Sequence, residues 1–525
     1  MVKGLRIGID FDNTLVSYDK LFKQIIKSKK WPLAKGEATK EQLKKVLLSS
    51  EPNDLKWQEI QSMAYGTEHM LKAKSFDGAL ECIKFLKRSG CEVYIVSHKS
   101  KKSHFDESKD LHEFAKKWIK ENNIHKVISL KNIFFEETLE KKNNRIKEIN
   151  CHFFIDDLEK VFKHPSFPSS CIPILFSKNK MDSLVTLTNW NLITHYFESL
   201  FTIDCRTFKA LLKSELKYIR PLNIKGNNRV FLLMSKAHLK TVLKVFATSD
   251  KKGREVSALK YYANEESLNA PHLIDELKGH PALIMEYVGE HKSDSSYEVE
   301  KVAGPILALE HKNINELNWA KDARTSLVDY FLSIEKRLLA LDKNLFKHAP
   351  TLHHKIINLK EVILNLVLLE SNDLSLDLRK KFSADQLIPS PSDFGLHNML
   401  FDKENLHFID FEFFGKDDPV KLWLDFLYHE GFSLPKDKRS EIVSYYLKNS
   451  KIEGLKQRFN LVQPLIQFEW ILIVLNALNT EQQKRRSKLF PHLDIESLSR
   501  SRLQRATQML NSLSKELINY GTKEL

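Results

Sequence analysis

Three short apolar runs constrain the fold of the first third of the chain. Each run is rich in β-branched or aromatic residues, and long amphipathic stretches such as DGALECIKFLKRSG (77–90) separate them. Runs that alternate with helical patterns are typical of buried parallel strands joined by helical crossovers. We therefore predict an α/β domain with a parallel sheet over residues 1–180. The three runs are RIGIDF (6–11), CEVYIVS (91–97) and HFFIDD (152–157).

The connection between the first two runs is longer than one crossover helix needs. Residues from about 18 to 76 are mostly compatible with helix. We predict that they form a helical cap inserted between the strands.

The pattern changes after residue 180. The polar stretch at 181–205 has no strong periodicity and predicts a linker. Between 206 and about 290 short β-like segments return, and from about 291 to 525 leucines at spacings of three and four predict helices. We expect a second, α+β domain with a small β-rich lobe and a large helical lobe. The β-like segments are RVFLLMS (229–235), KTVLKVF (240–246) and ALIMEYV (282–288).

Composition and charge favour an ordinary soluble protein. Lys and Arg exceed Asp and Glu by 82 to 68, but the excess is scattered in short runs, so we expect anionic substrates and no nucleic-acid partner. The five cysteines show no CxxC pair and no regular spacing, which favours a reducing compartment. The N-terminus lacks a signal-peptide layout, and the apolar run at 470–478 is far shorter than the roughly 20 residues that cross a bilayer. We predict a cytoplasmic protein without a membrane partner.

The first apolar run ends in two carboxylates. Asp10 and Asp12 alternate along an extended chain and so lie on the same side of it, where the strand stops. Such a pair can hold Mg²⁺ and divide the work of phosphoryl transfer between a nucleophile and a general acid/base. A helix N-cap or an ordinary strand-end turn is the alternative interpretation.

The other two runs also end in polar residues. Ser97 ends the second, and Asp156 with Asp157 ends the third. Because ligands bind at the carboxyl ends of parallel strands, we expect these side chains to converge. Lys142 lies in the basic segment EKKNNRIK (140–147), upstream of the third run, and could neutralise a phosphate. A solvated helix face explains such a segment equally well.

Together these residues carry a family resemblance. GIDFDNTLV, YIVSHKS, Lys142 and FIDDLEKVF resemble the four ordered motifs of haloacid-dehalogenase-type (HAD) phosphohydrolases, whose domain is a Rossmann-like parallel sheet with a cap. The resemblance implies that Asp10 is the nucleophile and Asp12 the general acid/base, and the second Asp points away from dehalogenases. It also implies the ligands of the phosphate and of Mg²⁺. For the phosphate they are Thr14, Ser97 and Lys142, with Lys141 as an alternative to Lys142. For Mg²⁺ they are Asp10, Asp156 and the backbone carbonyl of Asp12, with Asp157 as an orienting residue.

A second set of residues lies in the stretch SPSDFGLHNMLFDKENLHFIDFEFFGKDDP (390–419). Asp393 and Asn398 are five apart in a loop, and Asp410 follows a short strand after a turn. This arrangement offers a base and two oxygen ligands for Mg²⁺. Phosphoryl transfer from ATP needs these parts, because its catalysis is chiefly positioning and charge neutralisation.

The β-rich lobe supplies further pieces. Lys244 lies on a predicted strand, and Glu255 lies on the helix-compatible segment that follows, where it could pair with Lys244. Gly226 begins the segment GNNRVFLL, and Glu286 and Val288 lie where a strand leads into a connector. Each piece alone also fits a purely structural role.

Residues 210 to 470 resemble the aminoglycoside phosphotransferase and choline kinase group, which has a two-lobed protein-kinase-like fold. The resemblance implies that Asp393 positions the acceptor hydroxyl and that Asn398 and Asp410 hold Mg²⁺. It further implies an ATP site made by Gly226, Lys244, Glu255, Glu286 and Val288. Two departures stand out, since the usual His-Gly-Asp is Pro391-Ser392-Asp393 and the phosphate loop has only Gly226.

Our leading hypothesis is a bifunctional enzyme with Mg²⁺ as cofactor and ATP as co-substrate. A phosphatase domain would hydrolyse a phosphate ester, and a kinase-like domain would phosphorylate the hydroxyl of a small molecule. Similar fusions look like parts of surface-polysaccharide pathways, and by that resemblance we expect a sugar as the substrate. One alternative is an active phosphatase joined to a nucleotide-binding module without turnover. Another is a nucleic-acid end-processing kinase and phosphatase.

Overall fold

The computed structural model describes most of the chain and divides it into two compact units. Unit 1 comprises Met1–Ala247 and Leu277–Tyr287, and unit 2 comprises Thr248–Glu276 and Val288–Leu525. The division therefore falls within the stretch predicted as the β-rich lobe. The described residues are 4–33, 38–50, 54–179, 181–213, 216–222, 228–265, 268–289, 298–402, 405–431, 434–489 and 494–521.

A six-stranded parallel sheet forms the centre of unit 1, as predicted for an α/β domain. Its strand order is β5-β4-β1-β6-β7-β8, and every pairing is parallel. The three apolar runs of the sequence form β4, β1 and β6, which are neighbours in the sheet. The strands are β1 (Arg6–Ile9), β4 (Glu92–His98), β5 (Ile133–Glu136), β6 (Phe153–Asp156), β7 (Ile172–Phe176) and β8 (Val185–Leu187).

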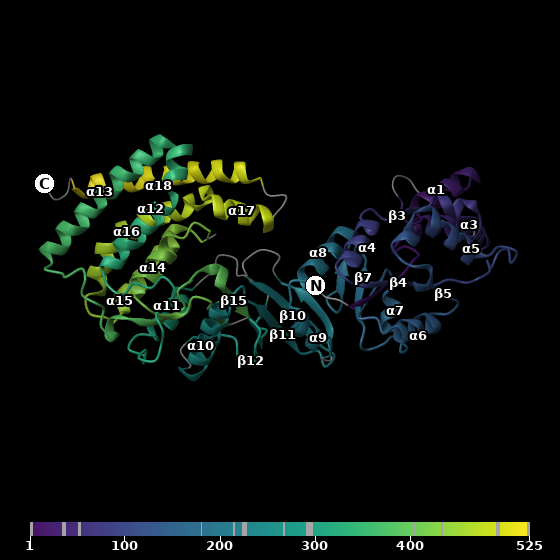
Figure 1. The fold of residues 1–525 in the computed structure, drawn as a ribbon, viewed down its shortest axis with the longest axis horizontal. Helices are drawn as coiled ribbons and strands as arrows, with labels where there is room; N and C mark the ends of the chain where they lie inside the picture. The colour runs from purple at the N-terminus through teal and green to yellow at the C-terminus, as the bar shows by residue number, and fades with distance from the viewer. Residues whose placement is uncertain are drawn as a thin grey trace. The chain divides into compact units, whose positions relative to one another are not determined.

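Helices cover both faces of this sheet (Figure 1). Helices α4 (Ala79–Arg88) and α8 (Trp190–Leu200) share a buried apolar cluster with Ile7 and Ile155, whereas α6 (Leu139–Ile149) shares another with Phe154. Alternating residues of β6 thus enter opposite cores, as the pleat of a strand requires. A Cβ on Gly8 would lie 2.4 Å from the Phe154 ring, so this position of β1 must be glycine.

The stretch predicted as a helical cap contains three α-helices. They lie between β2 (Val16–Ser17) and β3 (Lys74–Ser75), which pair with each other in antiparallel fashion. Phe22, Trp57 and Tyr65 are buried together in the cap, with ring centroids 5.1 to 5.7 Å apart for the pairs that include Phe22. The helical elements are α1 (Asp19–Ser28), α2 (Lys40–Ser50), α3 (Leu55–Gly66) and the 3₁₀ turn η1 (Glu68–Lys72), and α5 (Leu111–Glu121) packs against α3.

Residues 181–205, which we predicted as a linker, are structured as part of unit 1. They contain β8 and α8, and Asn189 caps α8 by accepting a hydrogen bond of 2.9 Å from the Leu192 amide. Trp190, Ile193 and Phe197 are fully buried on one face of α8. These residues recur at the spacing of three and four that a helix requires, and the polar stretch before them led to the linker prediction.

Unit 1 also contains an antiparallel sheet with the order β13-β11-β10-β9. Two contacts connect this part of the unit to the parallel sheet and its helices. The Tyr196 hydroxyl of α8 donates to the Ile219 carbonyl of β9 at 2.8 Å, and Phe153 of β6 stacks on Phe208 of α9. The elements are α9 (Cys205–Lys213), β9 (Leu216–Pro221), β10 (Arg229–Ser235), β11 (Lys240–Val245) and β13 (Ala282–Glu286), and β12 (Leu273–Leu277) lies where the units divide.

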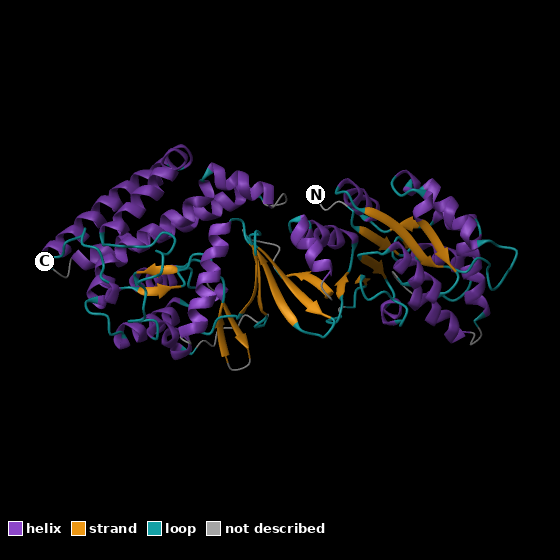
Figure 2. Ribbon diagram, turned by 60° about the horizontal axis from the view of Figure 1, so that its bottom comes forward, coloured by secondary structure: helices purple, strands orange, loops and turns teal. Residues whose placement is uncertain are grey.

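Unit 2 is mostly helical, with two short strand pairs (Figure 2). Helix α16 is its central element and contacts α12, α13, α14 and α18. The helices are α10 (Ser249–Glu265), α11 (Val299–Leu307), α12 (Val328–His348), α13 (Pro350–Asp373), α14 (Pro419–Tyr428), α15 (Lys436–Asn449), α16 (Leu455–Leu475), α17 (Thr480–Leu489) and α18 (Ile495–Gly521). The strand pairs are β14 (Ile388–Ser390) with β17 (Gly415–Asp417), and β15 (Met399–Asp402) with β16 (Asn405–Phe408).

One helical stretch among the described residues, Leu455–Leu478, is long and apolar enough to cross a membrane. It joins α16 to the 3₁₀ turn η6 (Asn476–Leu478) and is longer than the apolar run at 470–478 that we noted in the sequence. Of its most apolar window, 67% is buried inside unit 2, which is the behaviour of a core helix.

Candidate active sites

The first site lies where β1, β4 and β6 end. These strands are neighbours, so Asp10 after β1, Ser97 on β4 and Asp156 at the end of β6 meet at one edge of the sheet. The Asp10 amide donates to the Ile155 carbonyl at 2.9 Å, which ties the loop to β6. Asn13 then turns the chain with a φ of 59°, a conformation that asparagine tolerates.

Lys142 joins two of these carboxylates. Its Nζ donates to Asp10 Oδ1 at 2.6 Å and to Asp156 Oδ2 at 2.5 Å, and the Ser97 hydroxyl donates to Asp10 Oδ1 at 2.9 Å. All four side chains are buried. Thr138 caps α6 and so fixes the turn from which Lys142 reaches the site, whereas Lys141 is exposed and lies 3.9 Å from Glu137. The geometry therefore selects Lys142 over Lys141.

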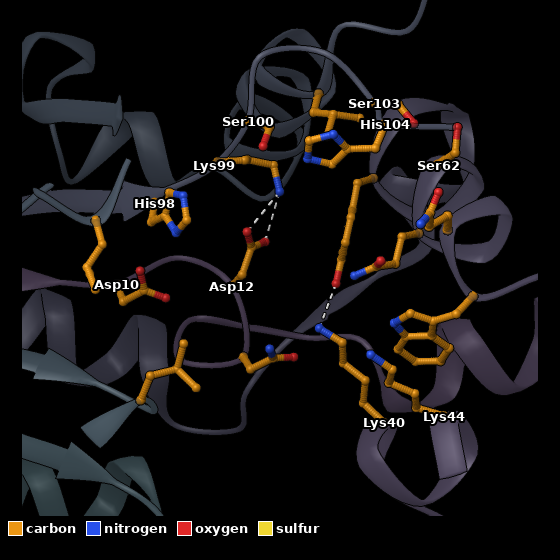
Figure 3. Close-up of a pocket in the computed structure, with 18 of the residues that line it drawn as sticks. Asp10, Asp12, Lys40, Lys44, Ser62, His98, Lys99, Ser100, Ser103 and His104 are labelled. Carbon is orange, nitrogen blue, oxygen red and sulfur yellow. Dashed lines mark hydrogen bonds and ion pairs between the residues drawn. The ribbon is translucent and has the colours of Figure 1, made fainter. Parts of the chain in front are cut away.

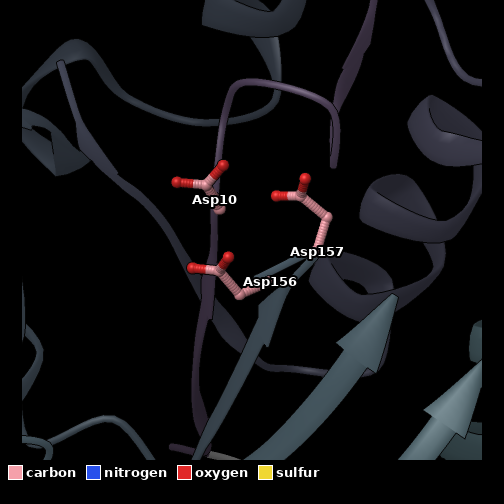
Figure 4. Close-up of side chains that lie close together, drawn as sticks. All are labelled: Asp10, Asp156 and Asp157. Carbon is pink, nitrogen blue, oxygen red and sulfur yellow. The ribbon is translucent and has the colours of Figure 1, made fainter. Parts of the chain in front are cut away.

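Three carboxylates gather around this cation. Oxygens of Asp10, Asp156 and Asp157 lie within 4.8 Å of one another (Figure 4). Burial and repulsion from neighbouring acids raise the pKa of Asp10 to about 7, although Lys142 pulls it down. Burial and repulsion from Asp10 raise the pKa of Asp157 to about 8. One lysine cannot balance three acids, of which Asp10 and Asp156 are buried and Asp157 is half-buried, so the cluster fits a divalent cation that prefers oxygen ligands.

Thr14 has a different place from the one predicted. Its side chain is fully buried, and its hydroxyl donates to Asp157 Oδ1 at 3.3 Å and accepts from the Asp157 amide at 3.1 Å. It therefore orients Asp157 and does not line the cavity.

Asp12 is held by two residues that the sequence analysis missed. Lys99 Nζ lies 3.0 and 2.9 Å from the two carboxylate oxygens (Figure 3). The Tyr18 hydroxyl donates to Asp12 Oδ1. Burial opposes the charge of Asp12, but Lys99 and Tyr18 outweigh it and hold its pKa below the ordinary value. Lys99 follows Ser97 by two positions, and this alternation along β4 was a usable signal.

A cavity of about 450 Å³ opens above Asp10 and Asp12. The cap lines it with Lys40, Lys44, Trp57 and Tyr65, and the loop after β4 adds polar side chains including Ser103 and His104 (Figure 3). This volume suits a small-molecule ligand.

The second site lies in unit 2, on the loops after β14 and β16. The Asn398 amide donates from Nδ2 to the Asp393 carbonyl at 2.9 Å, and the Ile409 amide donates to the Asn398 carbonyl at 2.9 Å. Asn398 therefore joins the loop of Asp393 to the residue before Asp410. Ser392 and Asp410 have φ values of 65° and 67°, which are unusual for residues other than glycine.

His397 orients the Asp393 carboxylate. Its Nε2 lies 3.4 Å from the carboxylate oxygens, and its ring stacks on His429 at 5.3 Å. Burial opposes the charge of Asp393, but the contact with His397 lowers its pKa below the ordinary value. Burial and the neighbouring His397 lower the pKa of His429 to about 4, so His429 is neutral at physiological pH.

A cavity of about 350 Å³ adjoins Asp393, and its charged residues are largely paired with one another. Glu469 accepts hydrogen bonds from Arg324 at 2.8 Å and from Arg337 at 2.7 Å. Asp425 lies 3.4 Å from Lys421 and accepts from the Trp470 indole at 2.9 Å. No local pattern in the sequence pointed to these residues.

The remaining predicted ATP-site residues are spread over both units. Lys244 is buried on β11 and Glu286 ends β13 in unit 1, whereas Glu255 is buried on α10 and Val288 lies in unit 2. Their predicted convergence stays a prediction. Gly226 lies outside the described residues.

No family model matches this chain, and no curated protein matches it. Solved structures similar to it include an ADP-bound aminoglycoside phosphotransferase, which is 18% identical with a TM-score of 0.40 and covers 57% of this chain and 97% of its own. A choline/ethanolamine kinase family protein from Mesorhizobium loti is 14% identical, with a TM-score of 0.40 and coverages of 57% and 90%. The choline kinase LicA from Streptococcus pneumoniae is 17% identical, with a TM-score of 0.39 and coverages of 60% and 99%. Because these identities and TM-scores are low, the function of the chain is inferred from its own side chains.

Proposed function

We propose that unit 1 is a Mg²⁺-dependent phosphomonoester hydrolase with Asp10 as its nucleophile. The observation that carries this proposal is the contact of Asp10 with both Ser97 and Lys142 beside Asp156 and Asp157. A nucleophile, a hydroxyl donor, a buried cation and a set of oxygen ligands are the parts that phosphoryl transfer to a carboxylate requires.

The reaction proceeds in two displacements. The Asp10 carboxylate forms a bond to phosphorus while the bond to the alcohol oxygen of the substrate breaks, and Ser97 and Lys142 hold the phosphoryl oxygens. Water then attacks the aspartyl phosphate and regenerates Asp10. A bound Mg²⁺ would supply charge neutralisation at Asp10, Asp156 and the carbonyl of Asp12.

Asp12 serves as the acid/base of both displacements. Because Lys99 and Tyr18 favour its ionised form, it is best suited to take the proton of the attacking water. In the first displacement the departing alcohol oxygen takes a proton from Asp12 in its minor, protonated form, and the attacking water of the second displacement returns a proton to the Asp12 carboxylate.

Phosphate release from a panel of phosphorylated metabolites tests this proposal. We expect Mg²⁺-dependent release by the wild type and background release by Asp10→Asn. Asp182→Asn, an exposed substitution in the same unit, serves as the control for the change of charge. Equal release by the wild type and Asp10→Asn would contradict the proposal.

For unit 2 the proposed activity is ATP-dependent phosphorylation of a small-molecule hydroxyl. The supporting observation is the ionised Asp393, which His397 orients at the edge of a cavity. Asp393 would accept the proton of the acceptor hydroxyl as its oxygen attacks the γ-phosphorus of ATP. The amide oxygen of Asn398 and the carboxylate of Asp410 would be the Mg²⁺ ligands.

A second candidate for unit 2 is a nucleotide-binding module without turnover. It is favoured by the left-handed backbone of Ser392, which lies directly before Asp393. ADP formation from ATP with a panel of alcohols separates the two candidates. Loss of ADP formation in Asp393→Asn supports the kinase, and ADP formation at background level in both the wild type and that variant supports the module.

A further inference from the structure

The cavity above Asp10 contains more positive charge than the phosphoryl group needs. Lys142 is matched by Asp10 and Asp156, and Lys99 is matched by Asp12. The cap adds Lys40 and Lys44, which are four residues apart on α2 and so share one face of that helix (Figure 3).

Lys40 differs from the two lysines near the strand ends in its surroundings. Its Nζ donates to the Tyr65 hydroxyl at 2.9 Å and lies 5.6 Å from the ring centres of Phe22 and Tyr65. Among the residues that the structure describes, no carboxylate forms an ion pair with it. A phenol and two aromatic rings hold this ammonium in place and leave other N–H groups for a ligand.

The position of Lys40 is fixed from its main chain as well. Its amide donates to Asp19 Oδ1 at 2.9 Å, so α1 anchors the first residue of α2. Lys44 is less constrained, because it is 40% exposed and lies 3.8 Å from Asp54. Lys40 is therefore the cap cation that is best placed to select a ligand.

We propose that the substrate of unit 1 carries a second anionic group, a carboxylate or a second phosphate, which Lys40 binds while Asp10 reacts with the first phosphate. This inference rests on the proposed phosphatase activity. The aromatic rings around Lys40 lower the local polarity and strengthen its attraction for an anion. Asp12 and Asp157 favour the charge of Lys40 through space, but neither is in ion-pair contact with it, so its ammonium can contact an anionic group of the substrate.

The test compares substrates that differ in the second anion. One pair is 3-phosphoglycerate and glycerol 3-phosphate, and the other is fructose 1,6-bisphosphate and fructose 6-phosphate. The full chain is assayed as wild type, Lys40→Gln, Lys40→Arg and Lys45→Gln, where Lys45 is an exposed residue of the same helix that does not line the cavity. Thermal unfolding verifies that each variant is folded.

We expect the wild type to favour the doubly anionic member of at least one pair in kcat/KM by about tenfold or more. Lys40→Gln should remove that preference through KM, with a larger loss on the doubly anionic member than on the singly anionic one. Lys40→Arg should keep part of the preference, and Lys45→Gln should keep all of it. The responding pair distinguishes a carboxylate from a second phosphate.

Two results would overturn the inference. One is a wild type that hydrolyses both members of each pair equally well, and the other is an equal loss on both members in Lys40→Gln. A wild type that releases no more phosphate than Asp10→Asn from any substrate would instead overturn the phosphatase proposal, and the inference would fall with it.

Discussion

The two candidate sites handle charge in opposite ways. In unit 1, Asp10, Asp156 and Asp157 are gathered around the single cation Lys142, which leaves an excess of buried negative charge. In unit 2, the cavity beside Asp393 contains acids and bases that satisfy one another, as in the Arg324–Glu469 pair.

This difference separates a carboxylate cluster that lacks enough cations of its own from a cavity whose charged residues are largely paired with one another. Excess buried carboxylate raises pKa values and favours metal binding, because a metal competes with the protons that the acids otherwise keep. Paired charges fix the shape of a cavity and leave hydrogen bonding to select the ligand. We therefore expect that the loss of one charge at the phosphatase site lowers phosphate release. The loss of one paired charge in the unit 2 cavity should instead lower the stability of that unit.

The largest effect should come from Lys142→Met. The substitution removes the buried cation that binds Asp10 and Asp156, and we expect phosphate release to fall by about 10³-fold. Lys141→Met, which changes an exposed neighbour, should keep wild-type activity. Equal phosphate release by Lys142→Met and Lys141→Met would contradict the proposed role of the buried cation.

Glu469→Gln should act on stability and spare the phosphatase. Burial opposes the charge of Glu469, but Arg324 and Arg337 lower its pKa to about 2. Loss of this buried partner should destabilise unit 2 by about 3 kcal/mol, measured by denaturant unfolding. Because the folded-state pKa is depressed, the stabilisation is present above the ordinary pKa near 4.5 and is lost as pH falls towards 2. The difference between wild type and variant should therefore shrink in acid, and a difference that grows there would refute this account.

Lys99→Met should reduce phosphate release by about 100-fold. Without Lys99, burial raises the pKa of Asp12, so the acidic limb of the pH–rate profile should move to higher pH. Lys99→Arg keeps the charge and should recover part of the rate. An unmoved acidic limb in Lys99→Met would show that Lys99 does not act through Asp12.

The smallest effect should come from His397→Gln. The 3.4 Å contact with Asp393 is partly exposed, so its loss should lower ADP formation by about tenfold or less. Most of the change should fall on kcat, because the contact orients the base. A change confined to KM would assign His397 to acceptor binding.

Residues at the ends of strands were predictable from the sequence. Asp10, Ser97 and Asp156 each close an apolar run, and parallel strands bring such ends together whatever lies between them. The sequence left Lys141 and Lys142 as neighbouring candidates on one helix. The structure distinguishes them, because Lys142 contacts Asp10 whereas Lys141 lies near Glu137.

Residues that join a site through tertiary packing had no local signal. Lys40 reaches the cavity only because the cap folds over the sheet, and Glu469 meets Arg324 across 145 positions of sequence. The helix at Trp190–Leu200, which was mistaken for linker, is held by the packing of its buried face in the core of unit 1. In each case distant packing determined the structure.

We propose that this one chain holds two separate phosphoryl-transfer centres, one around Asp10 and one around Asp393. The most direct measurement assays wild type, Asp10→Asn and Asp393→Asn in parallel for phosphate release from phosphorylated metabolites and for ADP formation with alcohols. We predict that Asp10→Asn loses only phosphate release and that Asp393→Asn loses only ADP formation. Loss of both activities from either single substitution, or of neither from both, would contradict the account.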